Sequence, residues 1–218
     1  MSEHAWEEAY VRFETPEEEA RKFQARLEWL GAQRWPRDAQ VVELFCGRGG
    51  GLVALERLGF TRLEGVDRSA ALLSQYGGSA TCHVADCLAL PLATESRDFA
   101  VVQGGLHHLE QLPADLERAL DEMWRILRPG GRAVVVEPWL TPFLELAHAA
   151  CRNRALRRLA PKLDAFAAMI ENELETYMRW LGRPDTILAA LERRFVPERR
   201  RIAWGKLYFV GRRRERSE

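Results

Sequence analysis

Lysine and net charge are both nearly absent from this sequence. Of its 32 basic residues only Lys22, Lys162 and Lys206 are lysine, and 32 acidic residues bring the formal charge to zero. The balance conceals an asymmetry, because residues 1–30 carry more acids than bases and residues 193–218 carry more bases than acids. Since arginine replaces lysine throughout the chain, we interpret it as a bias of composition rather than a phosphate-binding device.

Cysteine pairs and long apolar runs are also missing. The four cysteines, Cys46, Cys82, Cys87 and Cys151, form no CxxC pair and no disulfide framework spacing. No apolar run reaches the roughly 18 residues that a membrane span requires. The first ten residues lack the basic and apolar regions of a secretory signal. We therefore expect a reducing, cytoplasmic setting and no membrane span.

The composition is that of a folded globular protein. Hydrophobic residues make up 47% of the 218 positions and charged residues 29%, which excludes a disordered or collagen-like chain. A chain of this length buries enough surface for one sizeable core. We expect one domain with an appended lobe, and the sequence leaves the oligomeric state open.

Short apolar runs alternate with segments of helical periodicity. We predict strands at 41–45, 62–66, 80–85, 99–102 and 132–137, and helices at 52–58, 69–76 and 115–127. Thr15, Pro16 and Glu18 predict a capped helix ahead of them, with a capping box and proline at the first helical position. Nearly continuous apolar strands alternating with helices indicate an α/β fold with a doubly wound, mostly parallel sheet. Its binding crevice is expected at the carboxyl ends of the strands.

The last third of the chain departs from this alternation. Residues 142–195 are mostly helical with a break at 183–185, so we expect two or three helices that form a lobe. Runs at 199–204 and 207–210, with a turn at Gly205-Lys206, predict a C-terminal antiparallel hairpin and hence seven strands in a Rossmann-like sheet. The predicted parts are an N-terminal helical cap (1–36), a core (37–140 and 196–212) and a helical insertion (141–195). Residues 212–216 are expected to be a solvated tail.

A glycine-rich loop follows the first predicted strand. Four of the five positions from Gly47 to Gly51 are glycine, which allows close backbone approach to a ligand and positive φ angles. The helix that follows presents free N–H groups to an anionic group. A dinucleotide fingerprint GxGxxG would require a third glycine where Leu52 stands, so the loop alone is weak support for a nicotinamide cofactor.

Acidic residues stand at the ends of three successive strands. Glu43 precedes the glycine-rich loop, where an acid repels a pyrophosphate but suits a ligand that bears a cation. Asp67 ends the second strand, where a carboxylate can accept the hydroxyls of a ribose, and Asp86 ends the third. A cationic, adenosine-bearing ligand fits this arrangement. The sequence therefore predicts S-adenosylmethionine as the cofactor.

Five motifs in order resemble the class I S-adenosylmethionine-dependent methyltransferases, in particular the small-molecule, UbiE-like branch. They are VVELFCGRGG, LEGVDRS, HVADCLALPL, SRDFAVVQGGLHHL and RILRPGGRAVVVEP, between Val41 and Glu137. The C-terminal hairpin is similar to the reversed last strand of that fold. The resemblance implies an enzyme that transfers a methyl group to a small-molecule acceptor.

The resemblance also implies roles for individual residues. Glu43, Gly47 and Gly49 would line the methionine part of the cofactor, Asp67 would hold the ribose, Asp86, Cys87 and Leu88 would surround the adenine, and Gln103 would lie beside the sulfonium. Phe45 departs from the pattern, because the family usually has a glycine there. That departure puts the approach of the backbone to the amino-acid moiety in question.

His107 and His108 are the candidate catalytic residues. A neutral imidazole can take a proton from a substrate hydroxyl or hold the acceptor by a hydrogen bond. Because adjacent side chains point to different sides, we expect at most one of the two to face the crevice. No metal is expected: Cys82, His83 and Cys87 could suggest one, but His83 falls inside a predicted strand, which favours core packing.

Other interpretations stay open at this stage. Tyr10 and Phe13 fit either a lid over the cofactor or core contacts, and Trp139, Phe143 and His148 fit either a substrate pocket or a helical cover. A nicotinamide-dependent reductase and a non-catalytic module, contacting nucleic acid through its arginines, are the alternative functions. Arginines 199–201 lie on a predicted strand and alternate between its faces, which does not favour nucleic acid. The acceptor and the atom methylated cannot be deduced.

Overall fold

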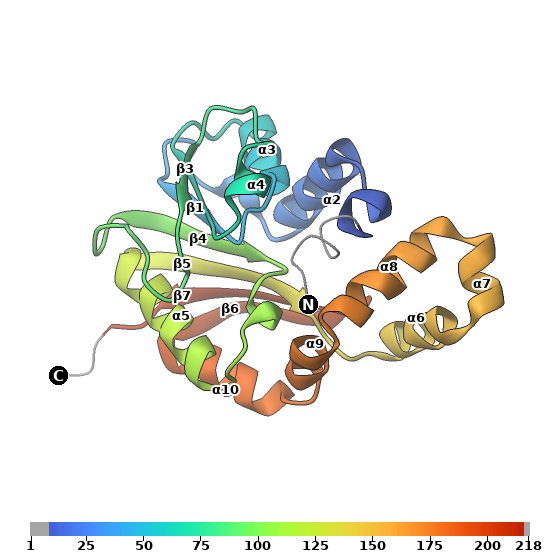
Figure 1. Ribbon diagram of the computed structural model, residues 1–218. Helices are drawn as coiled ribbons and strands as arrows, with labels where there is room; N and C mark the ends of the chain where they lie inside the picture. Colours follow the sequence, from blue (N-terminus) through green and yellow to red (C-terminus); the bar gives the residue numbers. More distant parts are fainter. Residues whose placement is uncertain (1–8, 216–218) are drawn as a thin grey trace.

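A seven-stranded sheet lies at the centre of the protein, with helices on both of its faces (Figure 1). The computed structural model describes residues 9–215, and its strand order is β3-β2-β1-β4-β5-β7-β6. Strands β1 to β5 pair in parallel, whereas β7 runs antiparallel to both β5 and β6. This confirms the predicted doubly wound, Rossmann-like sheet with a reversed C-terminal hairpin. The strands are β1 (Val41–Leu44), β2 (Leu63–Asp67), β3 (Thr81–Val84), β4 (Arg97–Gln103), β5 (Leu127–Pro138), β6 (Phe195–Ala203) and β7 (Lys206–Arg213).

The central strands carry apolar side chains on both of their sides because both faces of the sheet are covered. In β1, the side chains of Val42 and Leu44 belong to one core cluster. Val41, whose side chain points to the opposite face of the sheet, belongs to the other. Helices α5 (Ala114–Ile126), α9 (Leu174–Leu181) and α10 (Pro184–Arg194) contribute to the first cluster. Helices α2 (Pro16–Trp29) and α3 (Gly50–Arg57) contribute to the second. Such burial on both sides is what continuous apolar strands require.

Helix α2 begins as the sequence predicts. Thr15 accepts a hydrogen bond from the Glu18 backbone N–H, and the Glu18 side chain accepts one from the Thr15 backbone, so the capping box is complete. The helix packs against α3, and its apolar side chains share a core cluster with residues of β1, β4 and β5. Lys162 of α8 (Pro161–Asn172) also lies 2.6 Å from Glu18. The N-terminal helix therefore bridges the core and the helical lobe (Figure 1).

The segment between β5 and β6 forms five helices, not the two or three predicted. They are α6 (Pro142–Arg152), α7 (Arg154–Leu159), α8, α9 and α10. Asn153 caps α7, and proline occupies the start of both α8 and α10, so each begins a new helix. Helices α6 to α8 extend away from the sheet, and α9 and α10 return to it (Figure 1). No helix within residues 9–215 is long and apolar enough to cross a bilayer.

Two local predictions at the C-terminus are wrong. The hairpin turn is Trp204-Gly205 rather than Gly205-Lys206, and both turn residues have positive φ, 52° and 73°. These angles fit the type I′ turn that matches the twist of a two-residue hairpin. Arg213 does not belong to a solvated tail: it lies in β7, is buried and forms an ion pair with Glu95. Strand β7 extends to Arg213 because this residue pairs with Phe195 of β6.

Trp180 fixes the returning part of the lobe to the sheet. Its side chain is fully buried, and its indole N–H donates a 2.9 Å hydrogen bond to the carbonyl oxygen of Pro138, the last residue of β5. A buried tryptophan contributes a large apolar area, and the hydrogen bond sets its orientation. Helix α9 is therefore held at the carboxyl end of β5.

We expect Trp180→Ala to lower the free energy of unfolding by about 3–5 kcal/mol, because it leaves a cavity and an unpaired buried carbonyl. Urea denaturation measures the change. Met178→Ala is the matched control: it lies on the same helix, its side chain is exposed, and its effect should stay within about 0.5 kcal/mol. Equal losses in both variants would contradict the anchoring role.

Candidate active site

The glycine-rich loop connects the end of β1 to the start of α3 at the carboxyl edge of the sheet. Gly47 and Gly49 have φ angles of 52° and 82°, in the left-handed region that favours glycine. The Gly47 N–H donates a 2.7 Å hydrogen bond to Asp67 Oδ2, at the end of β2. The loop and the neighbouring strand end are thus joined directly.

Three consecutive glycines make room for three different side chains. A Cβ atom at Gly49 would lie 2.2 Å from the Tyr76 ring, and one at Gly50 would lie 2.6 Å from Glu19. At Gly51 it would lie only 1.8 Å from Glu43 Oε1. The absence of side chains therefore lets α3 approach Glu43. Sequence analysis selected Gly47 and Gly49 but missed the steric role of Gly51.

Phe45 stands where the resembling family has glycine, and the structure shows how the chain tolerates it. Its φ angle is 55°, a conformation that costs a non-glycine residue about 1–2 kcal/mol. The ring lies against Gly105, where an added Cβ would be 2.2 Å from Phe45 Cγ. It also packs on the apolar cluster that contains Val102 and Leu106. A large side chain at position 45 therefore depends on the lack of one at position 105.

Glu43 is a buried carboxylate with an incomplete set of partners. Its side chain is 2% exposed, and Gln103 Nε2 donates to its Oε1 across 3.3 Å. Glu43 Oε2 and Gln103 Oε1 are buried acceptors without a hydrogen-bond partner in the structure. Burial raises the pKa of Glu43 to about 8. The hydrogen bonds from Gln103 and the Leu52 backbone favour the charged form and oppose this rise, but they do not cancel it. Two adjacent unsatisfied acceptors suit a cationic donor.

Asp67 and Asp86 organise the next two strand ends. Asp67 accepts backbone N–H bonds from Gly47 and, at 2.8 Å, from Ser69, and two oxygens can accept further donors. The Ala85 N–H bonds to the Asp67 carbonyl, which brings the turn at Asp86 beside Asp67.

The turn after β3 contains the remaining predicted cofactor residues. Asp86 Oδ1 accepts from the Leu88 N–H at 2.9 Å, Cys87 is buried, and Leu88 packs against the core. Burial, followed by the nearby Asp86 carboxylate, raises the pKa of the Cys87 thiol to about 12, so it stays protonated. The structure thus brings Glu43, Gly47, Gly49, Asp67 and Gln103 together, with Asp86, Cys87 and Leu88 on the adjoining turn.

The N-terminal segment closes over the loop through a buried ion pair. Arg48 Nε lies 2.5 Å from Glu19 Oε2 of α2, and both side chains are almost fully buried. Arg48 also donates to the Glu14 carbonyl at 2.7 Å, and the Tyr10 hydroxyl donates to Glu19. Phe13 contacts Phe166 of α8 instead of the loop. Sequence analysis missed Glu19 and Arg48, because nothing in their local pattern distinguishes them from surface charges.

His107 and His108 lie together, which corrects the expectation that they diverge. They belong to a 3-10 turn, η2 (Leu106–His108), and their ring centroids are 4.1 Å apart. His107 Nε2 lies 3.9 Å and His108 Nδ1 2.5 Å from the Glu173 carboxylate, which the lobe supplies between α8 and α9. The alternation rule holds for extended strands, and a tight helical turn does not follow it.

Glu137, at the end of β5, supports His107 from the other side. Its Oε2 lies 2.7 Å from His107 Nδ1, and its Oε1 accepts 2.8 Å bonds from the backbone N–H groups of Gly105 and Leu106. Burial raises the pKa of Glu137, but His107 and these hydrogen bonds outweigh it and lower the pKa. Burial, followed by the neighbouring His108, lowers the pKa of His107. The strand-end rule that selected Glu43 could have selected Glu137 also.

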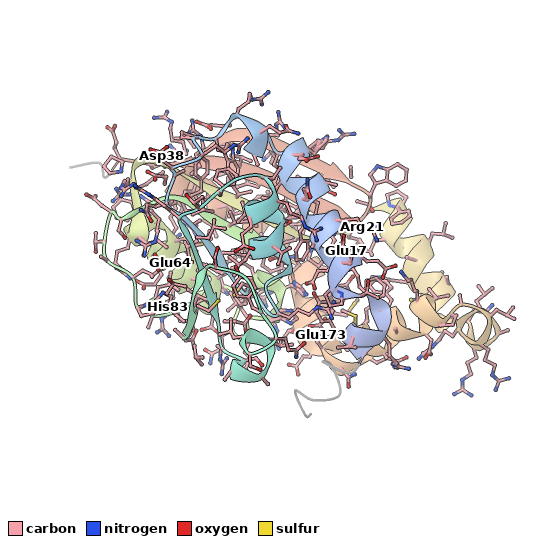
Figure 2. The ribbon with its side chains drawn as sticks, turned by 90° about the horizontal axis from the view of Figure 1, so that it is seen from above. Glu17, Arg21, Asp38, Glu64, His83 and Glu173 are labelled. Carbon is pink, nitrogen blue, oxygen red and sulfur yellow. The ribbon has the colours of Figure 1, made fainter. Side chains whose placement is uncertain are left out.

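Several other candidates lie outside this cluster. His83 pairs with Glu64 at 2.9 Å on strands β2 and β3 and is half-exposed, so the predicted core packing is wrong for this edge strand. Figure 2 shows both residues well away from Glu173. Trp139 is buried, whereas Phe143 is exposed and contacts the Trp204 ring edge-on. His148 forms a 3.0 Å hydrogen bond with the Tyr177 hydroxyl. These three residues therefore do not form one pocket wall.

The arginine-rich C-terminal region is largely neutralised by pairing. Arg194 pairs with Glu117 and Asp121, Arg200 with Glu192, and Arg213 with Glu95. Arg199 donates to the Trp29 carbonyl. These partners are all within the chain, so the guanidinium groups of these four arginines are engaged by the fold itself.

Comparison with protein families identifies the core segment. A family model described as a methyltransferase domain matches residues 42–135. The ubiquinone/menaquinone biosynthesis C-methyltransferase of Geobacter sulfurreducens is 32% identical over 117 residues, 48% of this chain and 43% of that protein. The demethylmenaquinone methyltransferase of Thermus thermophilus is 30% identical over 129 residues, 53% of this chain and 56% of that protein. The chain spans about half the length of the curated relatives it matches.

Solved structures resemble almost the whole chain. A Pyrococcus horikoshii protein aligns with a TM-score of 0.66 at 18% identity, covering 89% of this chain and 91% of its own. The geranyl diphosphate C-methyltransferase of Streptomyces coelicolor aligns with a TM-score of 0.63 at 17% identity, and the alignment covers 90% of this chain and 80% of that protein. At these identities the likeness establishes the fold. The resemblance that the five motifs predict is supported by the family model and the curated relatives, over the segment that they match.

The raised pKa of Glu43 makes stability depend on pH. The unfolded carboxyl ionises near pH 4.5 and the folded one near pH 8, so the folded state holds an extra proton between these values. The contribution of Glu43 is therefore most favourable below pH 4.5 and is lost as the pH rises to about 8. We expect Glu43→Gln to gain stability over the parent progressively across this window, by a few kcal/mol at pH 9, since one unit is about 1.4 kcal/mol. Denaturation at a series of pH values tests this, and a pH-independent difference would contradict it.

Gly51 offers a steric test with an internal control. We expect Gly51→Ala to lower the free energy of unfolding by about 1–3 kcal/mol, because its methyl group displaces the Glu43 carboxylate. Gly77→Ala adds the same atom where nothing lies within 4 Å, and it should cause no loss. Thermal denaturation of both variants distinguishes local crowding from a general intolerance of alanine.

Proposed function

We propose that this chain, whose residues 42–135 match a methyltransferase-domain model, transfers the methyl group of S-adenosylmethionine to a small-molecule acceptor. The observation that carries the proposal is the pair of unsatisfied buried acceptors, Glu43 Oε2 and Gln103 Oε1, beside the glycine-rich loop. A buried polar atom without a partner is costly unless a ligand completes it. The amino group of the cofactor's methionine moiety is such a ligand.

The charge of Glu43 matches this assignment. Burial raises its pKa to about 8, so the free protein holds it largely protonated at neutral pH. A cationic ammonium group nearby favours the ionised carboxylate and lowers that pKa again. Glu43 therefore binds the cation and releases a proton as it does so. Gln103 orients the carboxylate and lies beside the sulfonium.

The other predicted residues take positions along the remainder of the cofactor. Asp67 keeps acceptor capacity for the ribose hydroxyls, and its bond to Gly47 holds the loop at the right distance. Asp86, the backbone of Cys87 and the side chain of Leu88 surround the adenine. Gly47 and Gly49 leave the backbone open to the methionine part.

S-adenosylmethionine supplies, when bound, a methyl group on a positively charged sulfur, which is already a good electrophile. The residues of this chain need chiefly to position the acceptor and exclude water. Helix α2 and the lobe helices α6 to α9 form the cover, because the Glu19–Arg48 and Glu18–Lys162 pairs tie them to the loop and to each other. His107 and His108, with Glu173 facing them, position the acceptor at the end of β4.

The chemical class of the methyl acceptor is inferred from the relatives and not from the shape of a pocket. One curated relative is named as a C-methyltransferase of ubiquinone/menaquinone biosynthesis and another as a demethylmenaquinone methyltransferase. A structural neighbour is named as a geranyl diphosphate C-methyltransferase. All of these acceptors are small molecules. The lobe, which covers the site with short helices, is suited to enclosing one. All four cysteines are free in the structure, which supports the reducing, cytoplasmic setting predicted from their spacing.

Calorimetry with S-adenosylmethionine tests the proposal directly. We expect the parent protein to bind and Asp67→Asn to bind at least tenfold more weakly. The substitution removes a negative charge and replaces one hydrogen-bond-accepting oxygen by a donating NH2 group. Asp38→Asn is the control: this exposed aspartate precedes β1 and lies far from Glu173 in Figure 2. Thermal denaturation verifies that each variant is folded.

A second variant separates binding from loop damage. Glu43→Gln keeps the shape of the side chain, and we expect it to weaken binding and to abolish the release of a proton at pH 7, measured in buffers of different ionisation enthalpy. A parent protein that binds NADH in place of S-adenosylmethionine would overturn the proposal.

A further inference from the structure

We propose that His107, His108 and Glu173 form a binding site for one divalent transition-metal ion of the Zn²⁺ type. The site lies where the turn η2 after β4 meets the lobe between α8 and α9. It uses none of the residues assigned to the cofactor, so metal binding can be tested separately from cofactor binding. The sequence analysis expected no metal and did not consider Glu173, which no spacing motif links to the two histidines.

The three side chains converge on a common point. Their ligand atoms, one from each residue, all lie within 4.8 Å of one another. The Glu173 carboxylate is 2.5 Å from His108 Nδ1 and 3.9 Å from His107 Nε2. Zn²⁺ binds imidazole nitrogen and carboxylate oxygen at about 2.0–2.2 Å, so ligands on one ion lie about 3–4 Å apart. Small side-chain rotations bring the three atoms to that spacing.

The orientation of His107 is set by a residue outside the three. Glu137 is fully buried, and both of its oxygens are engaged, one by His107 Nδ1 and the other by two backbone N–H groups. Because the ionised Glu137 carboxylate can only accept hydrogen bonds, His107 must carry a proton on Nδ1. The Nε2 lone pair then faces the Glu173 carboxylate with no proton between them. A cation between the two resolves this contact, and a carboxylate behind a ligating histidine is the usual support of a metal site.

The donor set and its exposure indicate the kind of ion. Two imidazoles and one carboxylate suit Zn²⁺ and related first-row ions more than Mg²⁺ or Ca²⁺, which prefer all-oxygen ligands. His107 and Glu173 are mostly buried, whereas His108 is 33% exposed, which gives an ion a route of entry. Three protein ligands leave a coordination position open, as in catalytic zinc sites. If the proposed function holds, that position faces the acceptor and binds one of its oxygen atoms.

Metal titration of the full chain, without a histidine tag and after chelator treatment, tests the site. We expect Zn²⁺ to bind with a stoichiometry of one by calorimetry, and Co²⁺ to give the absorption of a nitrogen- and oxygen-ligated ion. His108→Ala and Glu173→Gln should each weaken binding at least tenfold. Glu175→Gln, an exposed residue of α9, and His83→Ala, which removes the separate pair with Glu64, should leave the affinity unchanged.

Three results would overturn the metal site: no binding, equal binding by the His108 and Glu173 variants, or a thiolate charge-transfer band that places Co²⁺ on cysteine. Each variant is also titrated with S-adenosylmethionine and melted thermally. Loss of metal affinity with cofactor binding and folding intact supports the proposal. A parent protein that binds the cofactor but not the metal refutes the metal site alone, whereas a parent protein that binds the metal but not the cofactor refutes only the proposed transfer.

Discussion

The close approach of helix α3 to the Glu43 carboxylate is the constraint on which the site depends. Only a glycine at position 51 allows it, since any Cβ there would overlap the carboxylate. The approach buries Glu43 and leaves one of its oxygens without a partner, which raises its pKa. An unfavourable buried carboxyl is thus maintained by the packing of the whole sheet, as is common where a protein reserves binding capacity for a ligand.

The sheet could be predicted from the sequence because its signal is local. Each central strand is a short apolar run, and burial on both faces imposes that pattern directly on runs such as Val41–Leu44. The positions of Glu43, Asp67, Asp86 and Gln103 follow from the same rule, since parallel strands end at one edge. Their contacts were therefore predictable in outline, although their assignment to parts of a cofactor remains a proposal.

Other parts of the site depend on tertiary contacts that no local pattern records. Glu19 resembles a surface residue of an amphipathic helix, and only the fold places it against Arg48. Glu173 reaches His107 and His108 because Trp180 holds α9 at the end of β5. The number of lobe helices was underestimated for a related reason: Asn153 and Pro161 stop and restart helices within one continuous helical composition.

The buried Arg48–Glu19 pair bears on how much of the chain is a self-sufficient folding unit. The segment that the methyltransferase-domain model matches, residues 42–135, contains Arg48 but neither Glu19 nor the Glu14 carbonyl. Excised at those boundaries, it would lose both partners of that guanidinium, together with the apolar side chains of α2 that share a core cluster with α3. The matched segment and the smallest independently stable fragment therefore do not coincide, because part of the hydrophobic core on which the segment packs lies on helix α2.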